Sequence, residues 1–422
     1  MQVIDRIELY HVAAPLPAPF SPSWMPGLTR TAVTFYLARF VTDDGVEGWS
    51  AFTGAGRERV GPGHALADMF LGRDSEDIDF VGERIHAMAV GGHFNWWLEP
   101  AFWDIKAKNA GLPLYKLLGG SDDRLRLYAS SGELRDTGAR REEAEKRYAE
   151  GFDTMKVRVH DFDEKVDIAH ITDIATHMQG RMKISVDCNQ AFRLTALGAA
   201  PRWSLDRAKR FADAAADVEL AWVEEPLFGE WHEDIARLTA YSRVPIAGGE
   251  LHLMGYHELA RMIRMRCYNI YQPDAMWTSG VKQSLDIAKL CHEEGVKFSS
   301  HTWTNGFGFI INAHVFAASG FAQDMVFEYP LNEPGWVPAG RDAIIKEPFM
   351  HDKGWFNMPQ TPGLGFEIDH DQLAKYGKRF FTASRKEVHW MPEVLAEMGC
   401  NNRAPRPAHR REWEHTTPNS LT

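Results

Sequence analysis

The sequence predicts an α/β fold in which an α+β segment precedes a parallel barrel. Two observations carry this prediction. After Gly119-Gly120 the chain alternates short apolar runs with amphipathic runs, a pattern typical of parallel strands joined by crossover helices. The polar residues that close successive strand runs recur at about the length of one strand-helix unit. Such side chains are expected to meet at the mouth of a barrel.

Eight apolar runs are predicted barrel strands. They are 125–129, 154–159, 183–188, 221–224, 244–247, 267–271, 297–300 and 325–327. Amphipathic runs between them have the spacing of helices. The helical runs include 141–150, 167–178, 205–216, 233–241, 257–265 and 283–294.

The first third of the chain is predicted to form an α+β cap. Residues 31–42 and 46–51 are expected to pair as a hairpin, because Asp43-Asp44-Gly45 between them is a turn of the Asp-Gly type. Residues 15–27 are rich in proline, so we expect a loop there, either a linker or an active-site lid. The predicted cap helices are 76–88 and 98–109.

We therefore expect three parts in the chain. They are a cap at 1–124, a barrel at 125–385 and a C-terminal segment at 386–422 that returns toward the cap and ends in a loosely ordered tail. The composition, 44% hydrophobic and 25% charged, excludes a disordered, collagen-like or membrane-bundle protein. The net charge of -11 leaves no general basic surface, so nucleic acid is not an expected partner.

The cysteines and the N-terminus favour a cytoplasmic location. None of the cysteines stands at CxxC spacing from another, which indicates reduced thiols rather than a disulfide frame or zinc knuckle. The N-terminus lacks the apolar core of a signal peptide. The apolar stretch 307–322 is too short to span a bilayer, so no membrane partner is expected. The cysteines are Cys188, Cys267, Cys291 and Cys400.

Three carboxylates close consecutive strand runs: Asp187, Glu224 and Glu250. Taken singly, each has a structural explanation, as a turn former, a charge at a helix start or a residue after a Gly-Gly bend. In register on neighbouring strands they supply hard oxygen ligands with no histidine or thiolate among them. This set favours Mg²⁺ over Zn²⁺.

Charged residues also end the other strand runs. Lys156 and Arg158 share one face of their strand, where they are either solvated at an edge or directed into the barrel mouth. Asp274 and His301 end adjacent units, so the aspartate could orient the imidazole as a general base or acid. A lone histidine there is more often a hydrogen-bonded core or helix-cap residue, and the pairing favours catalysis. Glu328 closes the last run.

These motifs resemble the mandelate racemase subgroup of the enolase superfamily, from the first strand to about residue 385. The barrel motifs are Lys156-Val157-Arg158, Val186-Asp187-Cys188-Asn189-Gln190, Trp222-Val223-Glu224-Glu225-Pro226, Gly249-Glu250, Pro273-Asp274, Ser299-Ser300-His301 and Phe327-Glu328. The cap segments 102–108 and 111–120 are similar as well. The resemblance implies a modified TIM barrel, (β/α)7β, with an N-terminal α+β capping domain.

The resemblance also implies roles for these residues. Asp187, Glu224 and Glu250 would bind one Mg²⁺ per chain, which holds a substrate carboxylate while the proton α to it is abstracted. Lys156 would neutralise the carboxylate, and Glu328 would hydrogen-bond the enediolate oxygen. The remaining pair, His301 with Asp274, would be the base on one face.

Arg158 departs from the racemising members, which place a second lysine base there. A guanidinium stays protonated, so it is a poor base and a good anion clamp. Racemisation needs a base on each face, whereas dehydration needs one base and an acid for the departing 3-hydroxyl. His301 could serve as both if the elimination is syn. The substitution therefore favours a single-base dehydratase.

Substrate-binding candidates lie around this mouth: Asn189, His252, Trp24 and Trp303. His252 is also a candidate leaving-group acid, although a packing role is slightly favoured. The proline-rich loop near Phe20 and the cap loop 53–59 would set substrate identity, and Arg57 and Arg59 either bind substrate or are solvated. Trp277 is expected to wall the pocket.

The sequence thus predicts a Mg²⁺-dependent hydro-lyase, a dehydratase that converts a sugar acid such as an aldonate into a 2-keto-3-deoxy acid. Its partner would be a small-molecule carboxylate, and we expect a homo-oligomer. One alternative is a cycloisomerase or epimerase of a sugar acid or lactone. The other is a sugar-acid-binding protein without catalysis.

Overall fold

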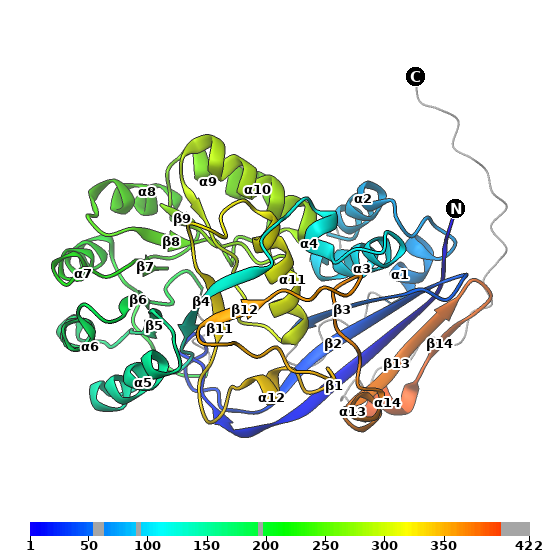
Figure 1. Cartoon of the computed structure of the whole chain (residues 1–422), viewed down its shortest axis with the longest axis horizontal. Helices are drawn as coiled ribbons and strands as arrows, with labels where there is room; N and C mark the ends of the chain where they lie inside the picture. The colour runs from blue at the N-terminus through cyan, green and yellow to red at the C-terminus, as the bar shows by residue number, and fades with distance from the viewer. Residues whose placement is uncertain (54–62, 90–93, 193–196, 398–422) are drawn as a thin grey trace.

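The computed structural model of the chain describes residues 1–53, 63–89, 94–192 and 197–397 (Figure 1). It confirms the α/β class: a barrel of parallel strands, drawn at the left of Figure 1, lies beside an α+β cap on the right. The barrel strands are β4 (Arg124–Ser130), β5 (Thr154–Arg158), β6 (Lys183–Asp187), β7 (Val223–Glu224), β8 (Ile246–Gly248), β9 (Ile270–Tyr271), β10 (Lys297–Phe298) and β11 (Phe327–Pro330).

Helices cross between these strands, which gives the (β/α)7β order. They are α5 (Thr137–Ala149), α6 (Glu164–Met178), α7 (Leu205–Asp217), α8 (His232–Tyr241), α9 (Tyr256–Arg264), α10 (Gly280–Glu294) and α11 (Gly306–Ala318). The sequence did not predict α11 as a helix. It is buried without interruption from Gly306 to Ala317, so it lacks the polar face that makes a helix visible in sequence.

The parallel pairing sets the functional residues level with one another. The strand order is β10-β9-β8-β7-β6-β5-β4-β11, and the Ser299 hydroxyl donates to the Val326 carbonyl at 2.9 Å between β10 and the start of β11. Arg158 on β5 lies opposite Asp187 on β6, which in turn lies opposite Glu224 on β7. The carboxyl ends of these three strands therefore meet at one edge.

The cap contains a five-stranded antiparallel sheet in the order β14-β13-β1-β2-β3. Its hairpin of β2 (Arg30–Thr42) and β3 (Glu47–Thr53) lies where the sequence predicts it. The chain returns to this sheet after the barrel: β13 (Gly377–Ser384) pairs with β1 and with β14 (Val388–Trp390). This return begins within the range 125–385 assigned to the barrel, and the three-part division itself stays a prediction.

The proline-rich segment is not the expected loop over its first half, because β1 runs from Ile4 to Phe20. Pro15, Pro17 and Pro19 alternate with buried residues and are exposed on one side of the strand. Beyond Val12 the strand has lost its β13 partner and pairs with β2 alone. A strand edge without a partner tolerates proline, since no ladder hydrogen bond is lost there.

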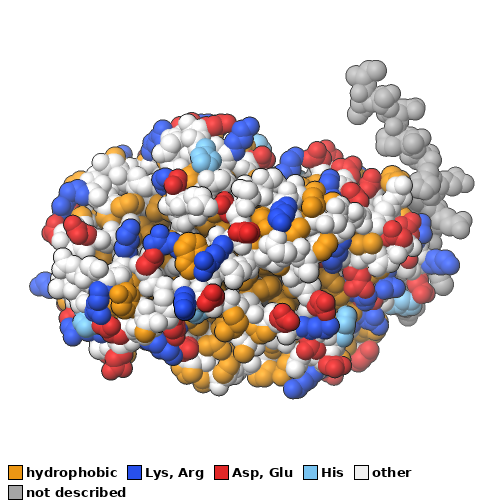
Figure 2. Space-filling view, viewed as in Figure 1, with side chains coloured by type: hydrophobic (Ala, Val, Ile, Leu, Met, Phe, Trp, Pro, Cys, Tyr) orange, Lys and Arg blue, Asp and Glu red, His pale blue; other side chains and the backbone are white. Residues whose placement is uncertain are grey.

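The other elements of the cap and the C-terminal part are short. They are α1 (Gly63–Phe70), α2 (Ile78–Met88), η2 (Trp96–Leu98), α3 (Glu99–Asn109), α4 (Leu114–Leu117), α12 (Pro338–Arg341), β12 (Trp355–Asn357), α13 (His370–Tyr376) and α14 (Pro392–Glu397). No helix among the described residues is long and apolar enough to cross a membrane. On the face shown in Figure 2, acidic and basic side chains are interspersed.

Candidate active site

Lys156 is the buried cation at the centre of the barrel mouth. Its ammonium group lies 2.5 Å from Glu224 Oε1 and 2.7 Å from Glu328 Oε1, and all three side chains are fully buried. Burial opposes the charge, yet the two carboxylates raise the pKa of Lys156 above its ordinary value. The Tyr128 ring, 5.5 Å from the ammonium, belongs to an apolar cluster that forms the floor of the site. Lys156 is therefore a fixed positive charge.

Arg158 ends β5 beside the lysine and pairs with Asp187 on the next strand. Its Nε donates to the Ser131 carbonyl at 2.7 Å, so the guanidinium is held on two sides. Trp24 from the cap and Trp303 from the barrel flank it, with their ring centroids 5.3 and 5.6 Å away. The two tryptophans predicted to bind substrate thus line the same position as the arginine.

His301 and Asp274 form the expected pair. His301 Nδ1 lies 2.9 Å from Asp274 Oδ2, and the other aspartate oxygen accepts from the Asn312 amide and the Met276 backbone. The opposite ring nitrogen, Nε2, lies 3.4 Å from Glu250 Oε2. Burial alone would lower the pKa of His301, but Glu250 and the Asp274 hydrogen bond raise it to about 9. The aspartate fixes Nδ1, which leaves Nε2 to exchange protons.

The three carboxylates predicted to bind metal lie at the same mouth but are not in mutual contact. Their oxygens are not among the described groups whose donor atoms all lie within 4.8 Å of one another. Arg158 contacts Asp187, and Lys156 contacts Glu224. The other Glu224 oxygen accepts from Trp222 Nε1 and Gln272 Nε2.

These residues nevertheless fit a divalent cation. Glu250 Oε2 and both Glu225 oxygens are buried without a hydrogen-bond partner. Burial, reinforced by neighbouring carboxylates, raises the pKa of Glu225 and Glu250 well above the ordinary range. Buried carboxylates that lack hydrogen-bond partners are hard oxygen donors, and Mg²⁺ prefers ligands of this kind. A cation here would relieve their mutual repulsion.

Glu328 accepts hydrogen bonds only. One oxygen contacts Lys156 and accepts from the Ser130 hydroxyl at 2.8 Å, and the other accepts from the Thr302 amide at 2.8 Å. Burial opposes its charge, but Lys156 and His301 lower its pKa to about 2. An ionised carboxylate cannot donate. Glu328 therefore holds Lys156 in this structure, and its hydrogen bond to an enediolate oxygen stays a prediction.

Two predicted substrate residues lie at the seam between cap and barrel. The Asn189 amide donates to Asp187 Oδ2 at 2.9 Å and accepts from the Ser23 hydroxyl of the cap at 2.6 Å. Trp303 Nε1 donates to Ser130 Oγ at 2.8 Å and stacks on Phe20, with centroids 5.7 Å apart. Both residues therefore connect the cap to the ends of the barrel strands.

His252 has no hydrogen bond to this group. Its Nδ1 lies 3.2 Å from Glu258 Oε1, and its Nε2 lies 3.3 Å from the Tyr268 hydroxyl. Both ring nitrogens of His252 thus have partners, Glu258 and Tyr268, outside the group of charged residues described above. The ring centroid of Trp277, which was expected to wall the pocket, lies 6.2 Å from that of His301. The candidates Arg57 and Arg59 lie outside the described residues.

Three residues of the site were missed in the sequence. Ser130 ends β4 and contacts both Glu328 and Trp303, and its place at a strand end was the available signal. Gln272 precedes the Pro273-Asp274 motif and holds Glu224. Glu225 adds a fourth carboxylate beside Glu224, but nothing in a Glu-Glu pair indicates that both side chains are buried.

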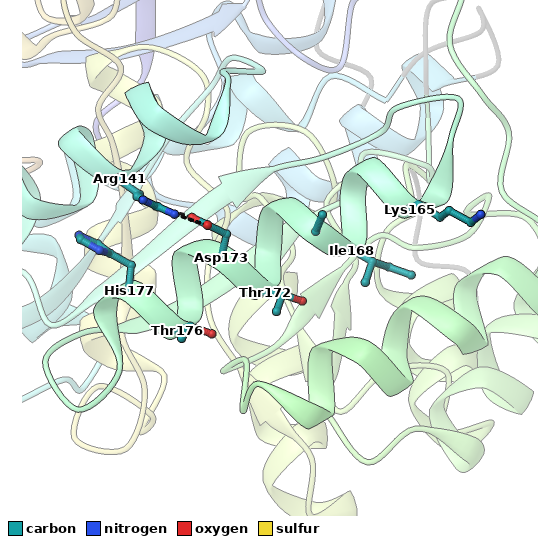
Figure 3. Close-up of a pocket in the computed structure, with 8 residues that line it drawn as sticks. Arg141, Lys165, Ile168, Thr172, Asp173, Thr176 and His177 are labelled. Atoms are coloured by element: carbon teal, nitrogen blue, oxygen red, sulfur yellow. Dashed lines mark hydrogen bonds and ion pairs between the residues drawn. The ribbon is translucent and has the colours of Figure 1, made fainter.

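A cavity of about 810 Å³ opens beside Arg158. Residues 21–23 and 25–28 of the cap and residues after β4 and β5 line it. A second hollow, of about 660 Å³, lies along the outer side of α6, where Arg141 pairs with Asp173 (Figure 3). The cavity beside Arg158 thus reaches one charged residue of the barrel mouth, whereas no residue of the mouth lines the hollow on α6.

Comparison with known proteins points to one family. Residues 139–372 match the enolase C-terminal domain-like model, and residues 6–119 match the N-terminal domain model of mandelate racemase / muconate lactonizing enzyme. Arabinonate dehydratase from Saccharolobus solfataricus is 27% identical over 83% of this chain and 92% of its own length. D-galactarolactone cycloisomerase from Agrobacterium fabrum is 27% identical over 88% and 98%.

A solved structure is similar to this chain as well. L-talarate dehydratase from Polaromonas, in complex with Mg and L-glucarate, superposes with a TM-score of 0.75 at 25% identity. The match covers 91% of this chain and 99% of that one. The cap and the barrel are therefore matched together, as one unit.

Proposed function

Because the chain belongs to the mandelate racemase / muconate lactonizing enzyme family of the enolase superfamily, we propose that it is a Mg²⁺-dependent sugar-acid dehydratase. The reaction removes the proton α to the carboxylate and the hydroxyl on C3, and the resulting enol tautomerises to a 2-keto-3-deoxy acid. The observation that carries the proposal is the His301–Asp274 pair at a mouth where Arg158, in the position of a second base, cannot act as a base.

His301 takes the α-proton at Nε2. Asp274 accepts from Nδ1–H, which places the lone pair of the neutral imidazole on Nε2 and stabilises the imidazolium that forms. The charge of Glu250 is the largest cause that raises the pKa of His301, so a cation held by Glu250 would lower this pKa and favour the neutral base. A general base of this kind contributes about 10²–10⁴-fold to a rate. The imidazolium then holds the proton that the departing C3 hydroxyl needs, so one residue serves both steps of a syn elimination.

Lys156 and Arg158 bind the substrate carboxylate. Both are buried cations held by carboxylates and backbone, so they are positioned before the substrate arrives. Fixed charges in a site without water stabilise the negative charge that develops on the carboxylate as the α-proton leaves. Trp24 and Trp303 pack against Arg158 and hold its guanidinium in place.

Asp187, Glu224 and Glu250 would hold Mg²⁺, and Glu225 is a further buried carboxylate near them. When bound, the ion supplies a Lewis acid for the substrate carboxylate. The Mg complex of the related L-talarate dehydratase supports this assignment. A ligand role for Glu224 and Asp187 requires Lys156 and Arg158 to share those carboxylates with the ion.

A second candidate is a cycloisomerase, supported by the similarity to D-galactarolactone cycloisomerase. It would use the same α-proton abstraction, with a ring oxygen in place of a hydroxyl as the leaving group. Product analysis separates the two activities, since dehydration releases water and cycloisomerisation does not change the mass of the substrate.

A panel of mono- and diacid sugars, screened for α-keto acid product, tests the proposal. We expect turnover of at least one sugar acid with Mg²⁺, none after EDTA treatment, and recovery when Mg²⁺ is restored. A product of unchanged mass would favour the cycloisomerase instead. Tight binding of a sugar acid with neither product would favour a binding protein and reject both enzymes.

A further inference from the structure

A second group of metal-ligating side chains lies at the same mouth, away from the carboxylates. His232 begins α8, His252 lies in the loop after β8, and Glu258 lies in the first turns of α9. One donor atom from each lies within 4.8 Å of the other two, the one such group among the described residues. None of the three has a hydrogen bond to Lys156, Asp187 or Glu224 among the contacts described above.

The contacts within this group match the spacing of ligands on one ion. Glu258 Oε1 lies 3.2 Å from His252 Nδ1 and 3.6 Å from His232 Nε2. Ligand atoms about 2.0 Å from a tetrahedral ion stand roughly 3.3 Å from one another. His232 Nε2 is buried and has no hydrogen-bond partner. Small side-chain rotations would therefore bring all three donors onto a common ion.

The surrounding hydrogen bonds hold the ligands in this orientation. The second oxygen, Glu258 Oε2, accepts from the Met254 backbone at 3.2 Å, which leaves Oε1 facing the histidines. The second nitrogen of His252, Nε2, meets the Tyr268 hydroxyl at 3.3 Å. Metal-bound histidines commonly use their other ring nitrogen in this way, which fixes the tautomer and the ring plane.

We propose that His232, His252 and Glu258 bind one Zn²⁺ ion, separate from the all-carboxylate magnesium site. Two imidazoles and one carboxylate are borderline ligands that suit Zn²⁺ and related transition metals, whereas Mg²⁺ prefers oxygen alone. His232 and Glu258 keep 20% of their side-chain surface exposed, so water completes the coordination. This zinc site does not depend on the proposed dehydratase activity.

The ion would join two loops that support the reaction. His232 follows the loop after β7, the strand of Glu224, and His252 follows Glu250 by two residues. Zinc between them ties together the loops that follow two of the magnesium carboxylates. We expect it to act as a structural clip at the mouth of the barrel.

The test is zinc binding by the full chain, stripped with a chelator and then saturated with Mg²⁺ to fill the oxygen site. Calorimetric titration with Zn²⁺ should give one ion per chain. His232→Ala and Glu258→Gln should each weaken binding by more than about 100-fold, and Tyr268→Phe by about 10–100-fold. Bound Co²⁺ should show the visible absorption of a four-coordinate site.

Two controls keep the test specific. His257→Ala removes a neighbouring histidine of α9 that lies outside the group and should leave zinc binding unchanged. Asp187→Asn disables the proposed magnesium site and should also retain one Zn²⁺. Absence of zinc binding in the Mg²⁺-saturated chain, or unchanged binding in folded His232→Ala and Glu258→Gln, would overturn the proposal.

Discussion

Lys156 illustrates how much of the site depends on single buried charges. It pairs with Glu224 and Glu328, and each of the three is fully buried. A buried ion pair gains little over apolar residues of the same volume, but removing one partner leaves an uncompensated charge in the interior. We therefore expect the lysine to be required for the stability of the mouth, in addition to its proposed role in binding the substrate carboxylate.

Lys156→Met should lower the free energy of unfolding by about 3–5 kcal/mol, because Glu224 and Glu328 lose their counter-charge. Urea denaturation measures the change. Lys165→Met, at an exposed position of α6, is the matched control and should stay within about 0.5 kcal/mol of the wild type. Equal losses in the two variants would show that the Lys156 ion pairs do not stabilise the fold.

At the scale of single residues, the positions of the charged residues could be predicted because each one closes a strand run. Spacing could not reveal which atoms they contact. Glu328 accepts hydrogen bonds from Ser130 and Thr302, partners that no spacing indicates, and its hydrogen bond to an enediolate oxygen stays a prediction. His252 stays a substrate-binding candidate, and its contacts with Glu258 and Tyr268 could not be predicted, since a position two residues past a strand-end carboxylate does not fix the direction of a side chain.

Among the elements, the end of β1 connects the cap to the active site. Phe20 closes this strand and contacts Trp24, Trp303 and Trp336, with ring centroids 5.3 to 6.0 Å away. Gly132, after β4, lies against this cluster: a Cβ there would stand 2.5 Å from the Trp303 ring and 2.7 Å from Phe20. The wall beside Arg158 therefore depends on a glycine.

Gly132→Ala should destabilise the protein by about 1–3 kcal/mol, because the added methyl overpacks the aromatic cluster. Gly82→Ala in α2 is the control, since a Cβ there meets nothing within 4 Å. It should be neutral or stabilising by up to about 1 kcal/mol, as expected for alanine in a helix. Thermal and urea unfolding of both variants check this, and an unaffected Gly132→Ala protein would contradict the close packing.

The cap also contacts the barrel through α3 and α10. Glu99, at the start of α3, accepts from the Val281 amide at the N-terminus of α10 at 2.5 Å. Ser279, the residue before α10, makes no side-chain cap of its own. Burial raises the pKa of Glu99 to about 7, although the Val281 amide opposes the shift.

This shift makes stability depend on pH with a definite sign. Between about pH 4.5 and 7 the folded state keeps a proton on Glu99 that the unfolded state has lost, so stability falls as pH rises. The loss is on the order of 3 kcal/mol across this range at 1.36 kcal/mol per pKa unit. Urea unfolding of Glu99→Gln should show a flatter pH dependence.

Glu83→Gln, at an exposed position of α2, is the matched control for Glu99→Gln and should keep the wild-type pH dependence. If Glu99→Gln keeps the wild-type pH dependence of the free energy of unfolding, the Glu99 carboxyl is not its cause.

Elements with a polar face or a turn signal could be predicted from sequence, and others could not. The β2–β3 hairpin follows from Asp43-Asp44-Gly45. By contrast, α11 is buried all round, and β1 continues through three prolines because it has become an edge strand. The pairing of β13 with β1 joins segments over 350 residues apart, a contact that no local pattern encodes.

In the whole molecule, the net charge is negative, but the site proposed to bind an anionic substrate carries a local positive charge. The chain carries a net charge of -11, yet Lys156 and Arg158 are buried at the mouth, and Arg158 lines the cavity of about 810 Å³. We therefore expect binding of a sugar acid to depend on this pair and on the proposed Mg²⁺ rather than on the net charge of the protein. The homo-oligomer stays a prediction.

The central claim is that His301 removes the α-proton of a sugar acid, and exchange of that proton in D₂O measures it most directly. With Mg²⁺ and a turned-over sugar acid, NMR should show deuterium entering the α-position or the product of the wild-type protein. His301→Asn should lose exchange by about 10²–10⁴-fold, while His257→Asn keeps it. Exchange at the wild-type rate in folded His301→Asn would contradict the account.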